Sequence, residues 1–225
     1  MKKYFSILVS LILASCTSVK EYNKKLEEPI PIVKLKKDVD FANKKLQKFH
    51  PNLYWYITKN QLDYKFDSLK QTIKQPLKPS EFYLKLAPII ADVREGHLRL
   101  VPLEKKLTQK ETKKIKNQKG LLSRFNYAIQ DNRLYIKDNT ENVGNLKIGT
   151  ELLKINDVPV AEILNKYRPL VTSDGYNTTY QKYSLARRFN TFFTLEYGIL
   201  DSLKVETKLK ESLQTVVLKR ETKTK

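Results

Sequence analysis

The sequence is short of the residues that build metal centres and disulfide frameworks. It has one cysteine, Cys16, and two histidines, His50 and His97, among 225 residues. A single cysteine excludes an intrachain disulfide, and structural zinc sites need about four Cys or His ligands. We therefore expect no metal and no cofactor that depends on such ligands.

Glycine is also scarce in the first half of the chain. Five of the six glycines lie at or beyond Gly120, and only Gly96 precedes them. Because glycine favours turns and interrupts helices, a helical first half and a turn-rich second half are expected. Hydrophobic residues make up 40% of the chain, which excludes a wholly disordered protein.

No stretch of about 20 apolar residues is present, but a shorter one opens the chain. Lys2 and Lys3 precede an apolar run from Phe5 to Ala14, which is typical of a secretory signal peptide. The run ends in Leu13-Ala14-Ser15-Cys16, which resembles a bacterial lipobox. The resemblance implies cleavage after residue 15 and lipid attachment at Cys16. The mature protein would then be held in the cell envelope on a bacterial membrane, periplasmic or surface-facing.

Acidic residues are outnumbered by basic ones, with 43 Lys and Arg against 24 Asp and Glu, a formal charge of +19. Such a balance is compatible with nucleic acid or anionic lipid as a partner. The basic residues are scattered and mostly lysine, and no nucleic-acid recognition motif is present. We expect a solvated lysine-rich surface and no nucleic-acid partner.

Periodicity divides the mature chain. Residues 16–34 are polar and read as a tether. Residues 35–103 carry helical patterns, with three helices expected: one that ends near Pro51, one capped by Thr58 with Gln61, and one capped by Ser80 and stopped by Gly96. A strand is expected over His97–Val101. Residues 104–119 hold seven lysines and read as a linker or a solvated surface helix.

Residues 120–222 change to a strand period. Hairpins are expected over Asp131-Asn132 and Lys210–Ser212, and a tight turn at Asn156-Asp157. Helices are expected from about Ala161 and over 176–196. The fold class is therefore α+β, with a helical N-terminal subdomain followed by a mostly β domain that has two helices.

Three stretches together resemble the tricorn and C-terminal-processing serine peptidases, especially their lipoprotein members. They are His50–Tyr56, Ala91–His97 and Gly149–Val160. The third is similar to the Gly-Asp-x-Ile-Leu-x-Ile-Asn-Gly signature of a PDZ-like peptide-binding domain, and residues 173–177 are similar to an insertion in it. The resemblance implies that 120–222 is PDZ-like and that His97 is the general base. Glu95 and Leu98 stand where the family pattern has Asp and Thr.

The nucleophilic serine of that family lies on a separate core after the PDZ-like domain. No serine here has a Gly-x-Ser-x-Gly setting. We therefore expect the N-terminal portion of a lipid-anchored serine peptidase, which binds peptides or unfolded protein and needs the missing C-terminal catalytic core in cis. The alternative is a non-catalytic, lipid-anchored peptide-binding module. Other interpretations also stay open: His50 as a helix cap, and Tyr54, Trp55 and Tyr56 as core or as a substrate shelf.

Overall fold

The computed structural model describes residues 18–115 and 119–221. The expected signal peptide, 1–15, and the expected lipid site, Cys16, lie outside these ranges. Within them, no helix combines the length and the apolar character needed to cross a bilayer.

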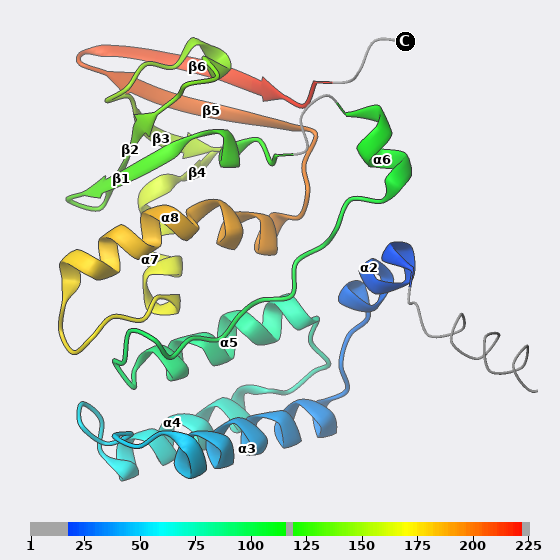
Figure 1. The fold of residues 1–225 in the computed structure, drawn as a ribbon, viewed down its shortest axis with the longest axis vertical. Helices are drawn as coiled ribbons and strands as arrows, with labels where there is room; N and C mark the ends of the chain where they lie inside the picture. Colours follow the sequence, from blue (N-terminus) through cyan, green and yellow to red (C-terminus); the bar gives the residue numbers. More distant parts are fainter. Residues whose placement is uncertain (1–17, 116–118, 222–225) are drawn as a thin grey trace, which may run out of the picture.

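The first half is helical, as predicted. Its helices, at the base and right of Figure 1, are α2 (Val19–Glu27), α3 (Ile32–Phe49), α4 (Lys59–Thr72), α5 (Pro79–Ala91) and α6 (Gln109–Lys114).

Part of the expected tether is a helix. Ser18 caps α2 by accepting a hydrogen bond from the Glu21 N–H. Leu26 is buried, and the Asn23 side chain exchanges two hydrogen bonds with the backbone of Lys106, at 2.6 and 2.9 Å. Residues 19–27 therefore pack on the folded protein.

The predicted helix starts are correct for α4 and wrong by two residues for α5. Thr58 and Gln61 form the expected capping box. Lys78, and not Ser80, is the N-cap of α5, and the Lys78 N–H donates to Glu81 Oε2 at 2.7 Å. Pro79 explains the shift, since its fixed φ and missing N–H suit the first helical position and move the cap to the residue before it.

The end of α5 differs from the prediction. The helix stops at Ala91, and the chain turns at Arg94, whose φ is 57° in the left-handed region. Gly96 therefore does not end the helix. The predicted strand His97–Val101 is also absent from the described chain, because no neighbouring strand pairs with it. The alternating apolar residues of this segment pack on the protein interior instead, because Leu98 and Leu100 contact the hydrophobic cores.

The lysine-rich segment contains the short helix α6, capped by Thr108 and Glu111. Residues 104–106 run beside α2 and bond to it. The division of the chain at residues 104–119 stays a prediction, which limited proteolysis can test.

The second half forms an antiparallel sheet with two α-helices. Its elements are η1 (Leu122–Arg124), β1 (Asn126–Gln130), β2 (Arg133–Asp138), η2 (Val143–Asn145), β3 (Glu151–Ile155), β4 (Val158–Pro159), α7 (Val160–Tyr167), η3 (Arg168–Leu170), α8 (Thr178–Tyr197), β5 (Ser202–Leu209) and β6 (Ser212–Lys219).

The strand order is β1-β2-β3-β5-β6, with β4 paired to β3. Asp131 and Asn132 both have positive φ, as do Asn156 and Asp157, which is the geometry of tight two-residue hairpin turns. The predicted hairpins and the α+β class are therefore confirmed. β1 and β6 are the edge strands.

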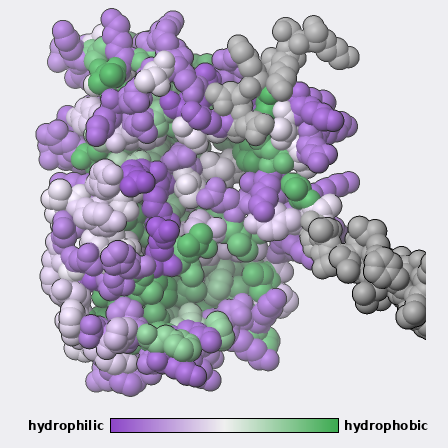
Figure 2. All heavy atoms as spheres, in the orientation of Figure 1, coloured by the Kyte–Doolittle hydropathy of each residue, from purple (hydrophilic) through white to green (hydrophobic). Residues whose placement is uncertain are grey.

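The elements are stacked in layers, with the sheet at the top of Figure 1, α8 and α7 below it, then α5, then α3 and α4. Two hydrophobic cores fill these layers. One lies between the sheet and α7 and α8, and the other among α3, α4 and α5. Helix α5 contributes to both, because Tyr83 and Ala87 belong to the first core and Leu86 and Ile90 to the second. In Figure 2 the hydrophobic surface gathers in the lower half, at the level of α5 and the helices beneath it.

Candidate functional site

His97 lies in the loop after α5, on the surface. Its imidazole is exposed and makes no hydrogen bond to any residue within 18–115 and 119–221. The backbone around it is held firmly. The His97 N–H donates to Glu95 Oε1 at 3.0 Å, and the Gly96 N–H donates to Asp174 Oδ1 at 2.6 Å. The loop is therefore fixed while the ring is free to meet another group.

The segment after η3 clamps this loop. Arg94 and Gly175 form two hydrogen bonds: the Gly175 N–H donates to Arg94 O at 2.9 Å, and Arg94 Nη1 donates to Gly175 O at 3.4 Å. The Arg94 guanidinium also lies over the Tyr176 ring, 4.3 Å from its centroid. Together with Asp174, these contacts join residues 94–96 to residues 174–176.

The segment after α3 completes the arrangement. The rings of Tyr56 and Tyr176 meet edge to face, with centroids 6.0 Å apart. Gly175 has φ 55°, and a Cβ there would lie 3.2 Å from the Tyr56 ring. Glycine suits the position on both counts, since it tolerates this φ without strain and leaves room for the ring.

His50 approaches the same loop from α3. It is the C-cap residue of α3, as one interpretation expected, and its N–H donates to Leu46 O at 2.9 Å. Its Nε2 lies 3.8 Å from Glu95 Oε2, and its buried Nδ1 has no hydrogen-bond partner in the part of the chain that the structure describes. Glu95 thus faces His50 with one oxygen and the His97 N–H with the other.

Of the two interpretations of the aromatic run, the core position is wrong. Tyr54, Trp55 and Tyr56 are all exposed, and only Tyr56 packs on another aromatic ring.

The contacts described above bring three segments together: His50–Tyr56, Ala91–His97 and residues 173–177. The sequence predicted no contact between them.

The described residues around His97 do not form a complete acyl-transfer site. An acyl-transfer site needs a nucleophile about 3 Å from its base, together with an oxyanion hole. Among the described residues, no hydroxyl or carboxylate side chain hydrogen-bonds the His97 ring. The described residues also include no group of three or more His, Cys, Asp or Glu placed to hold a metal ion.

A second feature is a groove between the edge strand β1 and helix α8, with a volume of about 820 Å³. Residues of β1 form one wall, and Thr179, Lys182, Tyr183, Ala186 and Arg187 of α8 form the other. Since β1 pairs only with β2, the backbone groups on its other edge have no strand partner. Sequence reasoning missed this groove, because it depends on where α8 lies.

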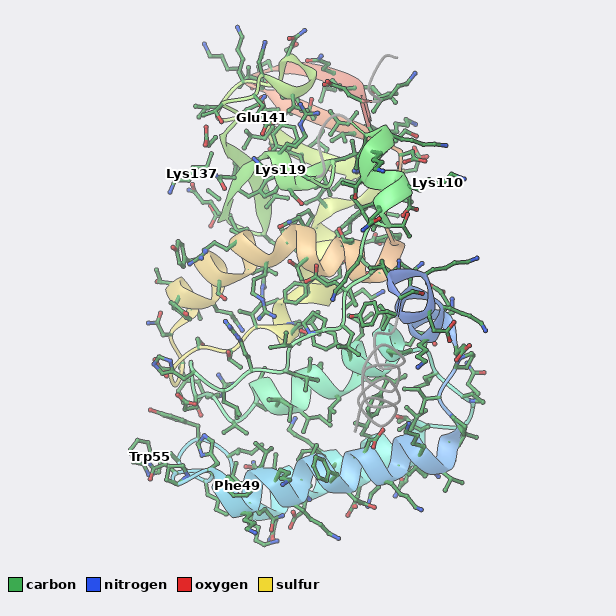
Figure 3. The ribbon with its side chains drawn as sticks, turned by 45° about the vertical axis from the view of Figure 1, so that its right-hand side comes forward. Phe49, Trp55, Lys110, Lys119, Lys137 and Glu141 are labelled. Atoms are coloured by element: carbon green, nitrogen blue, oxygen red, sulfur yellow. The ribbon has the colours of Figure 1, made fainter. Side chains whose placement is uncertain are left out.

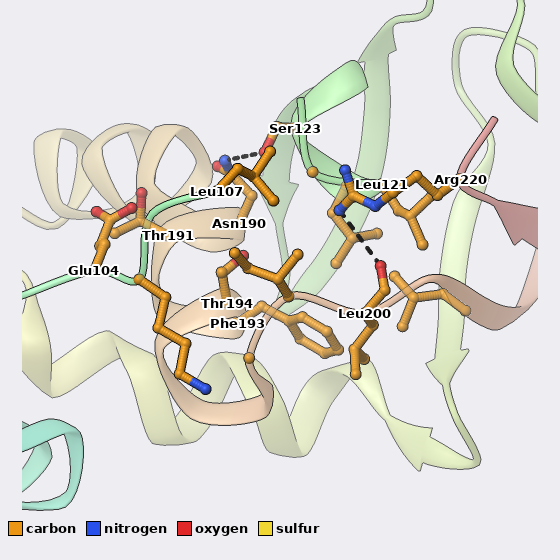
Figure 4. A pocket seen from close by; sticks show the side chains of 16 residues that line it. Glu104, Leu107, Leu121, Ser123, Asn190, Thr191, Phe193, Thr194, Leu200 and Arg220 are labelled. Carbon is orange, nitrogen blue, oxygen red and sulfur yellow. Dashed lines mark hydrogen bonds between the residues drawn. The ribbon is translucent and has the colours of Figure 1, made fainter. Parts of the chain in front are cut away.

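A smaller cavity, about 190 Å³, adjoins the groove behind the loop that precedes β1 (Figure 4). Ser123 and Asn190 line both spaces, and Asn190 Nδ2 donates to Ser123 Oγ at 2.8 Å between them. Arg220 borders the cavity and donates to Leu200 O at 3.4 Å. The Asn190–Ser123 hydrogen bond holds α8 to the loop at one end of the groove.

Comparison with known proteins gives distant likenesses only. No protein-family model matches the chain, and no curated protein matches it in sequence. Among solved structures it is similar to mature CPAF, a chlamydial serine protease, with a TM-score of 0.48 and 17% identity. It is also similar to a mutant of CPAF (0.49, 18%) and to mature CPAF complexed with lactacystin (0.48, 16%).

Each match covers 86% of this chain. The chain spans about a third of the length of these proteins, 35%, 34% and 35% in the same order. The function is argued from the chain's own residues.

Proposed function

We propose that this chain is the peptide-binding portion of an exported, lipid-anchored serine peptidase of the tricorn or C-terminal-processing type. In this proposal, the β1–α8 groove captures an extended peptide, and His97 is the general base for a serine that lies outside the described residues. The observation that carries the proposal is the meeting of three separate segments around an exposed, unpaired histidine.

The groove supports capture of an extended chain. A peptide that lies along a free strand edge gains backbone hydrogen bonds, and neighbouring pockets select its side chains. Strand β1 offers that edge. The α8 wall adds two cations, Lys182 and Arg187, while Asp138 is the acidic residue of the lining. This balance favours peptides with acidic or carboxylate groups.

The loop supports the role of His97. A general base must reach its partner within about 3 Å and stay oriented, while its acceptor nitrogen remains open. The Gly96 and His97 N–H groups donate to Asp174 and Glu95, and these hydrogen bonds fix the backbone that carries the ring. The exposed ring provides the access.

Peptide binding tests the groove directly. In a two-residue hairpin, Gln130 and Arg133 form a hydrogen-bonded pair, so Ile129 opposite Leu134 directs its N–H away from β2. The change Ile129→Pro removes that outward donor without removing a bond between β1 and β2. We expect binding of a fluorescent extended peptide, measured by anisotropy, to weaken at least tenfold.

The matched control is Val217→Pro on the other edge strand. By the same alternation Val217, opposite Lys204, directs its N–H away from β5. It is expected to leave peptide affinity unchanged. Equal loss of binding in both variants, with both still folded, would show that the peptide does not add to β1.

The free ring of His97 also fits a second function, a peptide-binding module without catalysis. A serine-reactive fluorophosphonate probe separates the two when applied to the protein isolated from its own membranes. Labelling of a polypeptide that contains this chain supports the peptidase. Peptide binding without labelling supports the module.

A further inference from the structure

The outer side of α3 has a basic and aromatic surface that neither core uses. Helical periodicity brings five lysines and two phenylalanines to this side, away from the buried Leu35, Val39 and Leu46. We call these seven residues the α3 outer face: Lys34, Lys37, Phe41, Lys44, Lys45, Lys48 and Phe49.

The positive charge of this face is not neutralised. All five lysines are exposed, and none forms an ion pair with a residue in 18–115 or 119–221. Asp40, which also lies on α3, is paired with Lys70 of α4 at 2.8 Å. Asp38 lies among these side chains, four residues after Lys34, and it is partly buried. The face therefore presents a local excess of about four positive charges.

Large aromatic side chains lie among these charges. Phe41 is 60% exposed and Phe49 63% exposed, and Lys45 Nζ lies 5.1 and 5.0 Å from their ring centroids. Just beyond the helix, Trp55 is 71% exposed. Figure 3 shows Phe49 and Trp55 at the same end of the molecule. Exposed rings beside lysines are typical of helices that lie in a membrane interface.

We propose that the α3 outer face docks onto an anionic bilayer, with the lysines at the phosphate headgroups and Phe41, Phe49 and Trp55 entering the interface. Each lysine near an anionic surface adds about 1 kcal/mol of attraction. The aromatic rings add the burial that a purely electrostatic contact lacks. A nucleic-acid site would instead be expected to offer arginines and polar groups for base edges, and the face has neither.

The position of α3 in the chain agrees with this orientation. It follows α2, which begins three residues after the expected lipid site Cys16. The lysine-rich, aromatic helix is therefore close in sequence to the point where the chain would meet the membrane. The docking itself needs no lipid on Cys16, and it is independent of any peptidase activity.

Vesicle binding of the chain from Thr17 to Lys225 tests the proposal without signal peptide or lipid. This form retains every residue that the structure describes. We expect it to sediment with vesicles of phosphatidylcholine and 30% phosphatidylglycerol, and not with phosphatidylcholine alone. Changing Lys37, Lys45 and Lys48 together to Gln should lower the partition coefficient on the order of 100-fold.

A matched control carries the same loss of charge elsewhere. Lys110, Lys113 and Lys114 of α6 are exposed, and Figure 3 shows Lys110 far from Phe49 and Trp55. Their triple change to Gln gives the same net charge and is expected to alter partition less than about fivefold. The difference between the two triple variants isolates the location of the charge.

The only tryptophan of the chain, Trp55, reports insertion. Its emission should shift to shorter wavelength with anionic vesicles and be quenched by brominated acyl chains. The double change of Phe41 and Phe49 to Ser should weaken partition further while α3 stays folded, since both rings are exposed.

Three results would overturn the proposal. One is binding that both triple-Gln variants lose equally. Another is vesicle binding without a change in Trp55 emission. The third is absence of vesicle binding together with tight, Lys37-dependent binding of duplex DNA, which would assign the face to a nucleic acid.

Discussion

The Gly96 N–H donates a 2.6 Å hydrogen bond to Asp174, a residue 78 positions further along the chain. This bond joins the loop that carries His97 to the segment that follows η3. The position of the loop backbone that carries the candidate base therefore depends on residues from the second half of the chain.

Removing the Asp174 carboxylate should loosen the His97 loop. Asp174→Ala leaves the Gly96 N–H without its acceptor, at a cost of about 1 kcal/mol because both groups lie at the surface. Hydrogen exchange of the Gly96 amide, followed by NMR, should accelerate by about fivefold to tenfold. Asp174→Asn keeps an acceptor oxygen and should retain most of the protection. Unchanged exchange in Asp174→Ala would contradict the role of this bond.

Gly175→Ala should destabilise the contact between Tyr56 and Tyr176. A left-handed φ costs a residue with a Cβ about 1–2 kcal/mol, and the Cβ would also press on the Tyr56 ring at 3.2 Å. In a Tyr56→Leu background the steric part should disappear, so the two changes should be non-additive by at least about 0.5 kcal/mol. Urea denaturation of the parent, the two single variants and the double variant measures the four free energies of unfolding. Strictly additive changes would show that the ring does not limit residue 175.

His97→Ala should slow turnover sharply in any polypeptide that contains this chain together with its nucleophile. Loss of a general base lowers kcat by about 10² to 10⁴, while peptide affinity in the β1–α8 groove stays the same. Arg99→Ala, an exposed neighbour two residues on, is the control and should stay within about threefold of the parent. A His97→Ala protein with most of its kcat would assign His97 a structural role.

Cys16→Ser should prevent lipid attachment. The sequence Leu13-Ala14-Ser15-Cys16 predicts that the thiol accepts the lipid. Radiolabelled palmitate should therefore mark the parent protein in growing cells and not the variant. Equal labelling of both proteins would refute the site.

Acidification should weaken the attachment of α2. Glu27 of α2 binds Lys105 and Lys78, and these contacts hold the pKa of its carboxyl below the usual value. A lowered folded-state pKa stabilises the protein above the unfolded value of about 4.3, and this stability is lost as the pH falls through the folded pKa.

Because Glu27 is half exposed, the contribution should stay below about 1 kcal/mol. The difference in unfolding free energy between the parent and Glu27→Gln should be constant above about pH 5 and shrink toward zero as the pH falls below 4. A difference that grew on acidification would have the wrong sign.

Local signals predicted much of the fold. Thr58 with Gln61, Asp131 with Asn132, and Asn156 with Asp157 each act within four residues, and each produces the expected cap or turn. Short-range chemistry decides these features wherever the segment lies. The failures at Ser80 and His97–Val101 have other causes. A proline displaced the cap, and no strand lay beside the alternating segment.

The site was less predictable because its contacts are distant in sequence. The pairs Arg94–Gly175, Tyr56–Tyr176 and His50–Glu95 form where the segments that follow η3, α3 and α5 meet. Nothing in the local pattern of any one residue indicates its partner. The resemblance to known peptidases singled out His50–Tyr56, Ala91–His97 and residues 173–177, but it said nothing of their contacts or of the groove beside α8.

Helix α5 is shared by the two hydrophobic cores, and this has a consequence for how the molecule can come apart. Heating that unfolds α3, α4 and α5 also removes Tyr83 and Ala87 of α5 from the core beneath the sheet. Conversely, loss of the sheet core uncovers one side of α5. A calorimeter would then record the two halves as one cooperative unit. A displacement of the helical layer would be transmitted to α8 through α5.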